Sequence, residues 1–588
     1  MQPKQTWSAS NALSVAMDKI LLIIRSFSQK ERKIFACLML IAFVSGLGII
    51  SYINHSFMVA IPLSGGTFTE GIVGTPRFVN PVLAVSDADK DLTALVYSGL
   101  LRKGNGGVLI PDLAEKYELS KNGLEYVFTL KPNLVWMDGQ PFTADDVVFT
   151  IQKIQDPSIH SPKAVSWGGV TVQKIDDRTV TFTLKEPYAP FIENTTVGIV
   201  PKHIWEGLTT DQWGYSSYNV QPVGTGPYQV TKVRQNSYGI PEYYDLAPFA
   251  HFALGKPYLS GITIKFYASD AALLDGYKAG EVNGFAALSP EVASELQSSG
   301  TRIERSPLPR VFSVFLNQTN QTLFTSKTVR SALNTGTDKD RIIDQVLLGY
   351  AAKADGPIPH GVMGSEKDGS TDQQKADEKE RIAAAQKILQ KDGWVLNQKT
   401  HIMEKTVKKT TQTLSFSLAT SNADELKAIA EILKEDWERI GAKVEVKVYE
   451  VGDLNQNVIR TRKYDALLFG EIIGNDPDPY AFWHSSQRFD PGLNIALYAN
   501  VTTDKLLEKA REAPDRDERI KLYQQFQAEV ERDIPAIFLY SPDFLYTLPQ
   551  NVQGVSLQNL TVSSDRFANI YKWYAKTQEV WRPFANIQ

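Results

Sequence analysis

The sequence predicts an α/β protein that follows a single membrane-spanning helix. A run of twenty residues without a charge, 34–53, lies near the start of the chain. Beyond residue 65, alternating segments predict paired strands in the first half, and a strand–helix–strand pattern in the second half predicts a parallel sheet covered by helices. With 588 residues the chain is long enough for several lobes, each with its own core.

The charge-free run has the length of a membrane anchor, because about 20 helical residues cross the ~30 Å hydrocarbon layer. Six basic and two acidic residues precede it, and the positive-inside rule then places the N-terminus in the cytoplasm. We therefore expect a basic, partly amphipathic cytoplasmic segment over residues 1–33, an anchor over 34–53, and a remainder that is periplasmic or extracellular. The protein would be a single-pass protein of the cell membrane.

Three other interpretations of this run are weaker. A cleaved signal peptide has a shorter apolar stretch and a small-residue cleavage site, which Phe57-Met-Val-Ala60 does not provide. A lipoprotein signal carries its cysteine at the end of the apolar run, whereas Cys37 lies near the start. A buried core helix fits poorly with so basic a chain start.

Alternating residues in the first half predict short strands. Leu124, Tyr126, Phe128 and Leu130 recur at every second position, and a strand containing Val180, Phe182 and Leu184 follows an Asp-Asp turn. Between them, Thr143 is a good N-cap for a helix whose first turn holds Asp145 and Asp146. These patterns predict a β-rich subdomain.

The second half changes to a strand–helix–strand pattern. Residues 413–418 alternate as a strand, and 443–449 alternate as another. Between them, apolar residues recur at helical spacing from Leu426 to Ile440, and Gly441 stands where a helix C-terminal glycine belongs. A further short strand, 465–469, is predicted next. Because ligands bind beyond the carboxyl ends of strands in open α/β sheets, we expect the site just after Phe469.

Composition and motifs exclude several kinds of function. The 62 basic and 66 acidic residues are balanced, so nothing indicates nucleic acid as a partner, and one cysteine cannot form an intramolecular disulfide. The sequence contains no G-x-x-x-x-G-K-[ST], G-x-S-x-G or H-E-x-x-H motif, and its seven histidines do not have metal-ligand spacing. We therefore expect no catalytic residues, metal site or cofactor.

The segment after Phe469 is the most informative. Residues 470–483, GEIIGNDPDPYAFW, combine three acidic groups, two prolines and three aromatic residues. The prolines stiffen the loop, its carboxylates could take a cation, and its aromatics could pack on side chains. A polar turn with satisfied aspartates is an equally good interpretation from composition alone. The candidate binding residues here are Gly470, Glu471, Ile472, Ile473, Gly474, Asn475, Asp476, Asp478 and Trp483.

Several segments in order carry a family resemblance. They are residues 113–130, residues 136–149 (WMDGQPFTADDVVF), Gly224-Thr-Gly-Pro-Tyr228, residues 329–334 with Asp338, and Leu348-Gly-Tyr350 with Gly356-Pro-Ile-Pro359. Through them the sequence resembles the family 5 bacterial solute-binding proteins, the dipeptide-, oligopeptide- and nickel-binding receptors of ABC importers. The likeness runs from about residue 65 to about residue 554.

The resemblance implies a two-lobed periplasmic-binding-protein clamshell (class II, cluster C type) with an extra β-rich subdomain. Lobe I would comprise residues 61–85, 215–305 and 535–588, the extra subdomain 86–214, and lobe II 306–534. Such a protein is not an enzyme. It closes around its ligand by a hinge motion and presents the ligand to a permease and an ATPase on separate chains. Receptors of this kind are commonly monomers, which we expect here too.

The resemblance also suggests roles for particular residues. Peptide binders of the family pair the peptide backbone with a lobe II strand, here Gly470–Gly474 by position. The aspartate that usually takes the peptide ammonium is replaced here by Asn475, so either Asp476 substitutes for it or the ligand has no free ammonium. Thr75 and Phe78 match a segment that lines the cleft, and Arg310 is a candidate partner for a ligand carboxylate.

The sequence thus predicts a membrane-anchored receptor that captures peptides and delivers them to an ABC transporter permease. Two alternatives keep the fold: a receptor for a non-peptide solute such as a metal chelate or sugar, and a sensor of solutes. A hydrolase that uses Asp476 and Asp478 is the weakest alternative, because no acid/base partner is identifiable.

Overall fold

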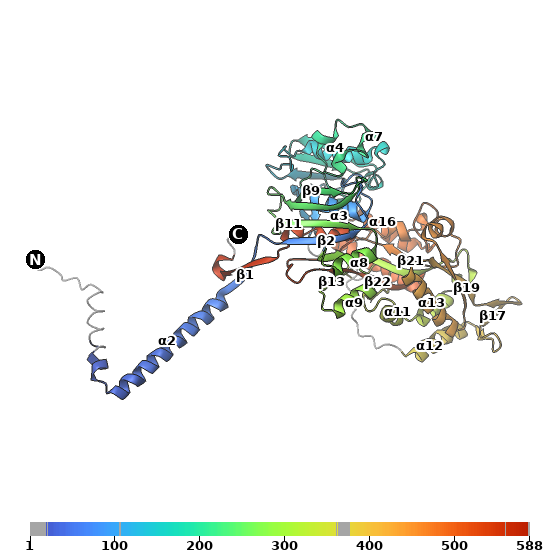
Figure 1. Ribbon diagram of the computed structural model, residues 1–588. Helices are drawn as coiled ribbons and strands as arrows, with labels where there is room; N and C mark the ends of the chain where they lie inside the picture. Colours follow the sequence, from blue (N-terminus) through green and yellow to red (C-terminus); the bar gives the residue numbers. More distant parts are fainter. Residues whose placement is uncertain are drawn as a thin grey trace, which may run out of the picture. The chain divides into compact units, whose positions relative to one another are not determined.

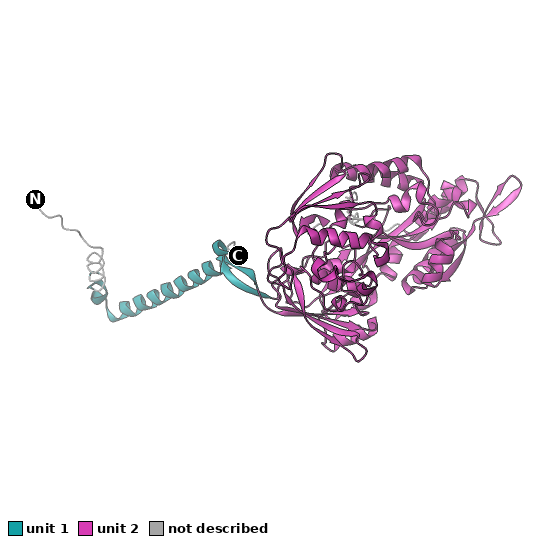
Figure 2. Ribbon diagram, turned by 90° about the horizontal axis from the view of Figure 1, so that it is seen from above, with its two compact units in different colours: residues 1–63, 576–588 teal, residues 64–575 magenta. Residues whose placement is uncertain are grey.

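The computed structural model describes residues 19, 22–104, 107–359, 361–362, 377–474, 476–558 and 560–585. The chain divides into two compact units: residues 1–63 with 576–588, and residues 64–575 (Figure 2). Each unit is described by itself.

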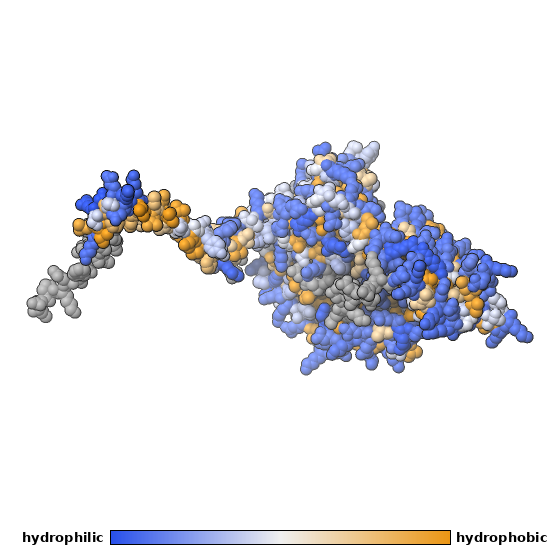
Figure 3. Space-filling view, turned by 90° about the horizontal axis from the view of Figure 1, so that it is seen from below, coloured by the Kyte–Doolittle hydropathy of each residue, from blue (hydrophilic) through white to orange (hydrophobic). Residues whose placement is uncertain are grey.

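The smaller unit consists of one long helix and a two-stranded sheet. Helix α2 (Gln29–Phe57) begins at a capping box formed by Ser28 and Glu31, and none of its residues is buried. Strand β1 (Met58–Leu63) follows directly and pairs antiparallel with β23 (Lys576–Trp581) along its whole length. Figure 3 shows the apolar residues of α2 in orange. The helix extends beyond the predicted anchor 34–53 at both ends, and the capping box stabilises its polar first turn. The structure of the predicted cytoplasmic segment lies mostly outside the described residues.

The β-rich subdomain predicted in the first half is present. Its four-stranded antiparallel sheet has the order β5-β6-β8-β7. Helix α4 (Ala144–Gln155) packs on this sheet and begins at the predicted N-cap Thr143, which forms a capping box with Asp146. The strands are β5 (Ala114–Leu119), β6 (Glu125–Leu130), β7 (Thr171–Asp176) and β8 (Thr179–Thr183).

A twelve-stranded sheet runs through the rest of the larger unit, as far as the described residues show (Figure 1). Its path is β20-β19-β21-β14-β22-β12-β2-β11-β10-β9, and β13 and β15 also pair with β22. The strands are β2 (Thr67–Val73), β9 (Tyr228–Gln235), β10 (Pro241–Pro248), β11 (Gly261–Tyr267), β12 (Gly284–Ala286), β13 (Ile303–Pro307), β14 (Arg310–Leu316), β15 (Ala351–Lys353), β19 (Ser415–Ser421), β20 (Lys443–Tyr449), β21 (Ala466–Ile472) and β22 (Ala536–Thr547).

Strand β22 belongs to both halves of this sheet. Its first part pairs with β14, from Ala536 to Tyr540, and its last part pairs with β12 and β13, from Asp543 to Thr547. We call the part of the sheet on the β12 side, with its helices, lobe I and the part on the β14 side lobe II. The predicted residue boundaries of the lobes remain a prediction.

Helices cover the sheet in both lobes, and the strand–helix–strand unit is formed as expected. Helix α13 (Asp424–Arg439) packs on the parallel pair β19–β20, and Gly441 adopts φ 99° at its C-terminal end. The larger unit also contains α3 (Asp87–Val96), α8 (Asp270–Lys278), α9 (Pro290–Ser298), α10 (Lys327–Gly336), α11 (Lys339–Gln345), α12 (Glu378–Lys391), α15 (Tyr480–Trp483), α16 (Val501–Glu512) and α17 (Arg516–Asp533).

The hydrophobic cores follow the same division. One core joins lobe I to the β-rich subdomain and includes Phe68, Phe128 and Trp573, whereas lobe II contains two cores of its own. The β-rich subdomain is therefore packed as part of lobe I.

Candidate functional site

The chain crosses between the two lobes twice, and the two crossing segments are hydrogen-bonded to each other. One crossing is Leu308-Pro309, between β13 and β14, and the other is Ser541-Pro542 in β22. The Leu308 N–H donates to the Pro542 carbonyl at 3.0 Å, and the Ser541 hydroxyl donates to the Leu308 carbonyl at 2.8 Å. Two adjacent crossings tied together in this way form a hinge about which the lobes can rotate.

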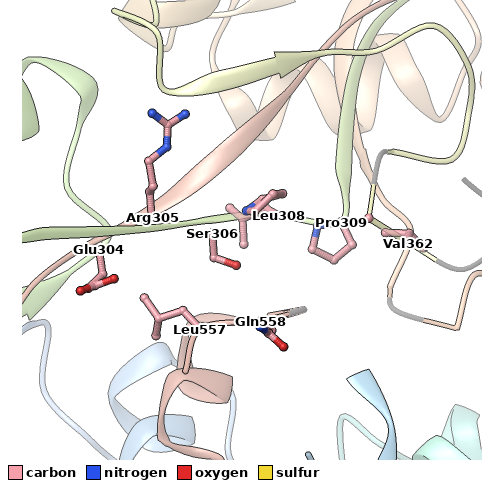
Figure 4. A pocket seen from close by; sticks show the side chains of 10 residues that line it. Glu304, Arg305, Ser306, Leu308, Pro309, Val362, Leu557 and Gln558 are labelled. Carbon is pink, nitrogen blue, oxygen red and sulfur yellow. The ribbon is translucent and has the colours of Figure 1, made fainter. Parts of the chain in front are cut away.

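A pocket of about 270 Å³ lies at this hinge. Figure 4 shows Glu304 and Ser306 pointing from β13 toward Leu557 and Gln558, while Arg305 points the other way. Arg305 pairs with Asp543 of β22 instead. The pocket therefore lies against the hinge segment Pro307–Pro309, with Glu304 and Ser306 on the lobe I side and Val362 on the lobe II side.

Strand β21, where we expect the ligand backbone, has one incompletely paired edge. It pairs along its whole length with β14, from Ala466 to Ile472. On its other edge β19 pairs only with Ala466 and Leu467. Within the described residues no other strand pairs with β21, so the backbone of Phe469–Ile472 offers an edge to which an extended chain can add.

Gly470 is needed in this strand because of what lies opposite. A Cβ atom on Gly470 would lie 2.8 Å from the ring of Phe312, its partner residue in β14. The Phe312 ring in turn stacks on Tyr540 with ring centroids 4.8 Å apart. The glycine thus allows an aromatic pair to pack directly against β21, beside the hinge.

Glu471 and Trp483 face the interior of lobe II rather than the cleft. Glu471 is 4% exposed, its Oε1 has no hydrogen-bond partner among the described residues, and burial raises its pKa well above the ordinary value. Trp483 is completely buried and packs on Phe315 and Phe538. Trp483 stabilises the core beneath the binding strand and Glu471 is enclosed in that core, so neither is expected to contact the ligand.

The two aspartates of the loop are held in ion pairs. Asp476 accepts from Arg519 of α17 at 3.0 Å, and both side chains are almost fully buried. Burial raises the pKa of Asp476 and Arg519 opposes the rise. Arg519 already neutralises Asp476 and would compete with a ligand ammonium for it, while the Oδ1 atom of Asp476 has no hydrogen-bond partner among the described residues. Asn475 itself lies outside the described residues.

Asp478 is bound by Arg511 of α16 and by the β-rich subdomain. Arg511 donates through Nε at 2.9 Å and through Nη2 at 2.6 Å, and the Tyr188 hydroxyl donates at 3.2 Å. The next residue, Ala189, donates its N–H to the Arg511 carbonyl at 2.9 Å. Asp478 therefore joins lobe II to the subdomain that is packed with lobe I.

Arg310 has the properties of a ligand partner. It is the first residue of β14, opposite Ile472, and its Nε is buried without a hydrogen-bond partner in the described part of the chain. Burial lowers its pKa, with Asp87 of α3 as the opposing charge. An unpaired guanidinium at the hinge fits a ligand carboxylate.

Thr75 and Phe78 lie on a lobe I loop that α3 holds in place. Thr75 is exposed and Phe78 is partly exposed. The Asp89 carboxylate accepts from the backbone N–H groups of Arg77 and Phe78 at 2.7 and 2.8 Å, and from those of Val85 and Ser86. One buried carboxylate thus fixes both ends of this loop.

Sequence reasoning missed the cations that pair with the loop aspartates, and it missed Tyr188. Arg511 and Arg519 are 33 and 43 residues from their partners, and no local pattern indicates such pairs. A search of the described residues for three or more His, Cys, Asp or Glu side chains placed to hold a metal ion finds none.

Comparisons with known proteins agree on one family. The model of "Bacterial extracellular solute-binding proteins, family 5 Middle" matches residues 108–490. The oligopeptide-binding protein AppA of Bacillus subtilis is 28% identical over 519 residues, which cover 87% of this chain and 92% of that protein.

Solved structures have the same two-lobed fold. The structure of AppA from Bacillus subtilis in complex with a nonapeptide is 27% identical, with a TM-score of 0.64, and covers 88% of this chain and 100% of that one. The ABC transporter substrate-binding protein CtaP of Listeria monocytogenes is 27% identical, with a TM-score of 0.71, and covers 87% of this chain and 99% of that one.

Proposed function

This chain belongs to the family 5 bacterial extracellular solute-binding proteins, and from that premise we propose that it is a receptor that captures peptides and delivers them to an ABC transporter permease. The observation that carries the proposal is the free edge of β21 beside the hinge, since strand addition binds any peptide through its backbone. Arg310 supplies a cation for a peptide carboxylate. The similarity to a protein named as an oligopeptide-binding protein supports the same ligand class.

In this proposal the protein carries out no chemistry. Its residues recognise a ligand, close around it and release it to membrane subunits on separate chains. Backbone pairing gives affinity without sequence selectivity, while the pockets on either side of the strand select among side chains.

Calorimetry and thermal shift against mixed tri- to pentapeptides test the peptide assignment. A ligand at 100 times its Kd stabilises a protein by about 2.7 kcal/mol, so we expect a clear rise in Tm with several peptides. The Arg310→Gln variant should bind them more weakly, and Arg234→Gln, an exposed arginine of lobe I, should bind them normally. A complete lack of stabilisation by peptides would contradict the assignment.

We also propose that α2 is retained as a membrane anchor with the N-terminus in the cytoplasm. In the described part of the chain, α2 is the one helix that is long and apolar enough to span a bilayer. Strand β1 begins at the residue after α2 and pairs with β23, and the Trp581 indole donates to Asn54 of the helix at 2.8 Å. Cleavage after Ala60 would remove half of β1 from this sheet.

Intact-mass spectrometry of the membrane-extracted protein tests the retained anchor. We expect the mass of the uncleaved chain, recovered only with detergent. A mature N-terminus between residues 55 and 63 would contradict the proposal.

A further inference from the structure

A second pocket, of about 350 Å³, opens on the lobe I side of the cleft, in a volume typical of ligand sites. It lies between α3, residues 163–167, residues 193–198 and residues 561–568. The charge of Asp476 in lobe II acts on Glu193 of this pocket, and that of Asp87, one turn before the pocket residue Lys90, acts on Arg310. Tyr188 and Ala189, a few residues before the pocket residue Glu193, contact Asp478 and Arg511 of lobe II, so this wall of the pocket lies near the loop that follows β21.

Two of the pocket's cations are already neutralised. Arg102 pairs with Asp112 at 2.7 Å, and Lys103 pairs with Asp565 at 2.7 Å. These pairs are structural parts of the wall and leave no charge for a ligand.

Lys163 is different, because its amine has no ion-pair or hydrogen-bond partner among the described residues. Burial lowers its pKa, Lys90 and Lys103 lower it further, and Asp565 opposes the fall. Among the described residues Lys90 has the exposed Asp87 as its ion-pair partner, at 3.9 Å. Lys163 and Lys90 are therefore the cations of this pocket that lack a close counter-charge in the described part of the chain.

The remaining acid of the pocket cancels this charge only in part. Burial raises the pKa of Glu193 to about 7, Lys103 opposes the rise, and Asp476 and Asp565 add to it, so near neutral pH about half of this carboxyl is protonated. A protonated carboxyl can donate a hydrogen bond to an anion.

Further polar groups in the pocket wall have no partner. The hydroxyls of Thr93 and Tyr97 and the Oδ1 atom of Asp112 are buried without a hydrogen bond to any described residue. Because buried polar groups are usually hydrogen-bonded, a polar ligand group that reached these atoms would complete their hydrogen bonding.

We propose that this pocket receives a negatively charged group of the bound peptide, with Lys163 as its counter-charge and the Thr93 and Tyr97 hydroxyls as donors. The inference rests on the proposed function and names the class of its ligand: peptides that carry a carboxylate at the residue placed in this pocket.

Calorimetry on the full-length protein in detergent, with two series of tetrapeptides, tests this ligand class. In one series a glutamate occupies each position in turn and is compared with glutamine there; in the other the C-terminus is free or amidated. The first series reports a side-chain carboxylate and the second the terminal carboxylate.

For one pair of peptides, we expect the unmodified chain to bind the carboxylate form at least about tenfold more tightly than the neutral form. One hydrogen bond to a charged group accounts for a difference of this size. The Lys163→Met variant should lose this preference and still bind the neutral peptides. Lys163→Arg should retain it, and Lys121→Met, an exposed lysine of the same subdomain, should behave like the unmodified chain.

Equal affinity for carboxylate and neutral peptides would overturn this inference and leave the peptide assignment intact. The inference would also be overturned if Lys163→Met kept the preference for the carboxylate peptide that Lys121→Met shows. If no peptide binds the unmodified chain, the proposed function itself fails, and the inference fails with it.

Discussion

At the scale of single residues, the two aspartates of the loop after β21 form ion pairs with arginines that are distant in the sequence. Asp476 and Asp478 follow β21 as expected, yet Arg519 and Arg511 neutralise them. Near the cleft, Arg310 and Lys163 are cations for which the described residues provide no ion-pair partner. These two cations favour a ligand whose anchoring charge is negative, as does the neutral amide of Asn475 at the position where the family resemblance predicts an aspartate.

A buried network of charged residues in lobe I depends on a single arginine, Arg566. Arg566 donates to Glu70 at 2.8 Å and to both carboxylate oxygens of Asp91, and Tyr546 donates to Glu70 at 2.6 Å. Burial raises the pKa of both acids, so they remain ionised only with the help of Arg566.

We therefore expect Arg566→Met to lower the free energy of unfolding by about 3–5 kcal/mol, because it leaves two buried carboxylates without a counter-charge. The loss should shrink as the pH falls, since protonation neutralises both acids. Urea unfolding at several pH values measures it. Arg234→Met, at the exposed pair with Glu242, is the control and should change little. A similar stability for both variants would contradict this account.

At the scale of elements, local sequence patterns predicted those helices and strands whose signals lie within a few residues of one another. The helix from Leu426 to Ile440, its terminal Gly441, the flanking strands and the Thr143 cap are present, because each depends on residues a few positions apart. The arrangement of β14 between β21 and β22 could not be predicted, because strands distant in sequence pair through tertiary packing. For the same reason the sequence did not indicate that Trp483 is a core residue or that Arg519 pairs with Asp476.

The loop before α3 is an element whose order depends on one side chain. Asp89 is 2% exposed and accepts from four backbone N–H groups, so Asp89→Ala should leave them without partners. We expect a loss of about 2–4 kcal/mol in unfolding free energy, and faster hydrogen exchange at residues 77–86.

Asp87→Ala on the same helix is the matched control, because Asp87 is exposed and pairs with Lys90 only at 3.9 Å. It should leave stability and exchange nearly unchanged. Slow exchange at residues 77–86 in Asp89→Ala would show that other contacts hold the loop.

At the scale of the whole molecule, the contact of Tyr188 and Ala189 with Asp478 and Arg511 links the lobes across the cleft. Because the β-rich subdomain shares a core with lobe I, this contact can form only when lobe II lies close to it. It is therefore suited to hold the closed form.

We expect Tyr188→Phe to release bound peptide about tenfold faster, since the variant loses a hydrogen bond to a charged group but keeps its ring beside Arg511. Stopped-flow dissociation of a labelled peptide measures the rate. Tyr215→Phe, at a tyrosine that is 89% exposed, should release it at the normal rate. An unchanged rate in Tyr188→Phe would remove this contact from the closing mechanism.

The central claim is that this chain is a peptide receptor, and the ligand that it carries when purified tests that claim most directly. Native mass spectrometry of the protein extracted from cells, followed by denaturation and sequencing of the released molecules, identifies this ligand. We predict short peptides of mixed sequence, enriched in a carboxylate at one position. A uniform non-peptide solute, such as a metal chelate or a sugar, would contradict the claim.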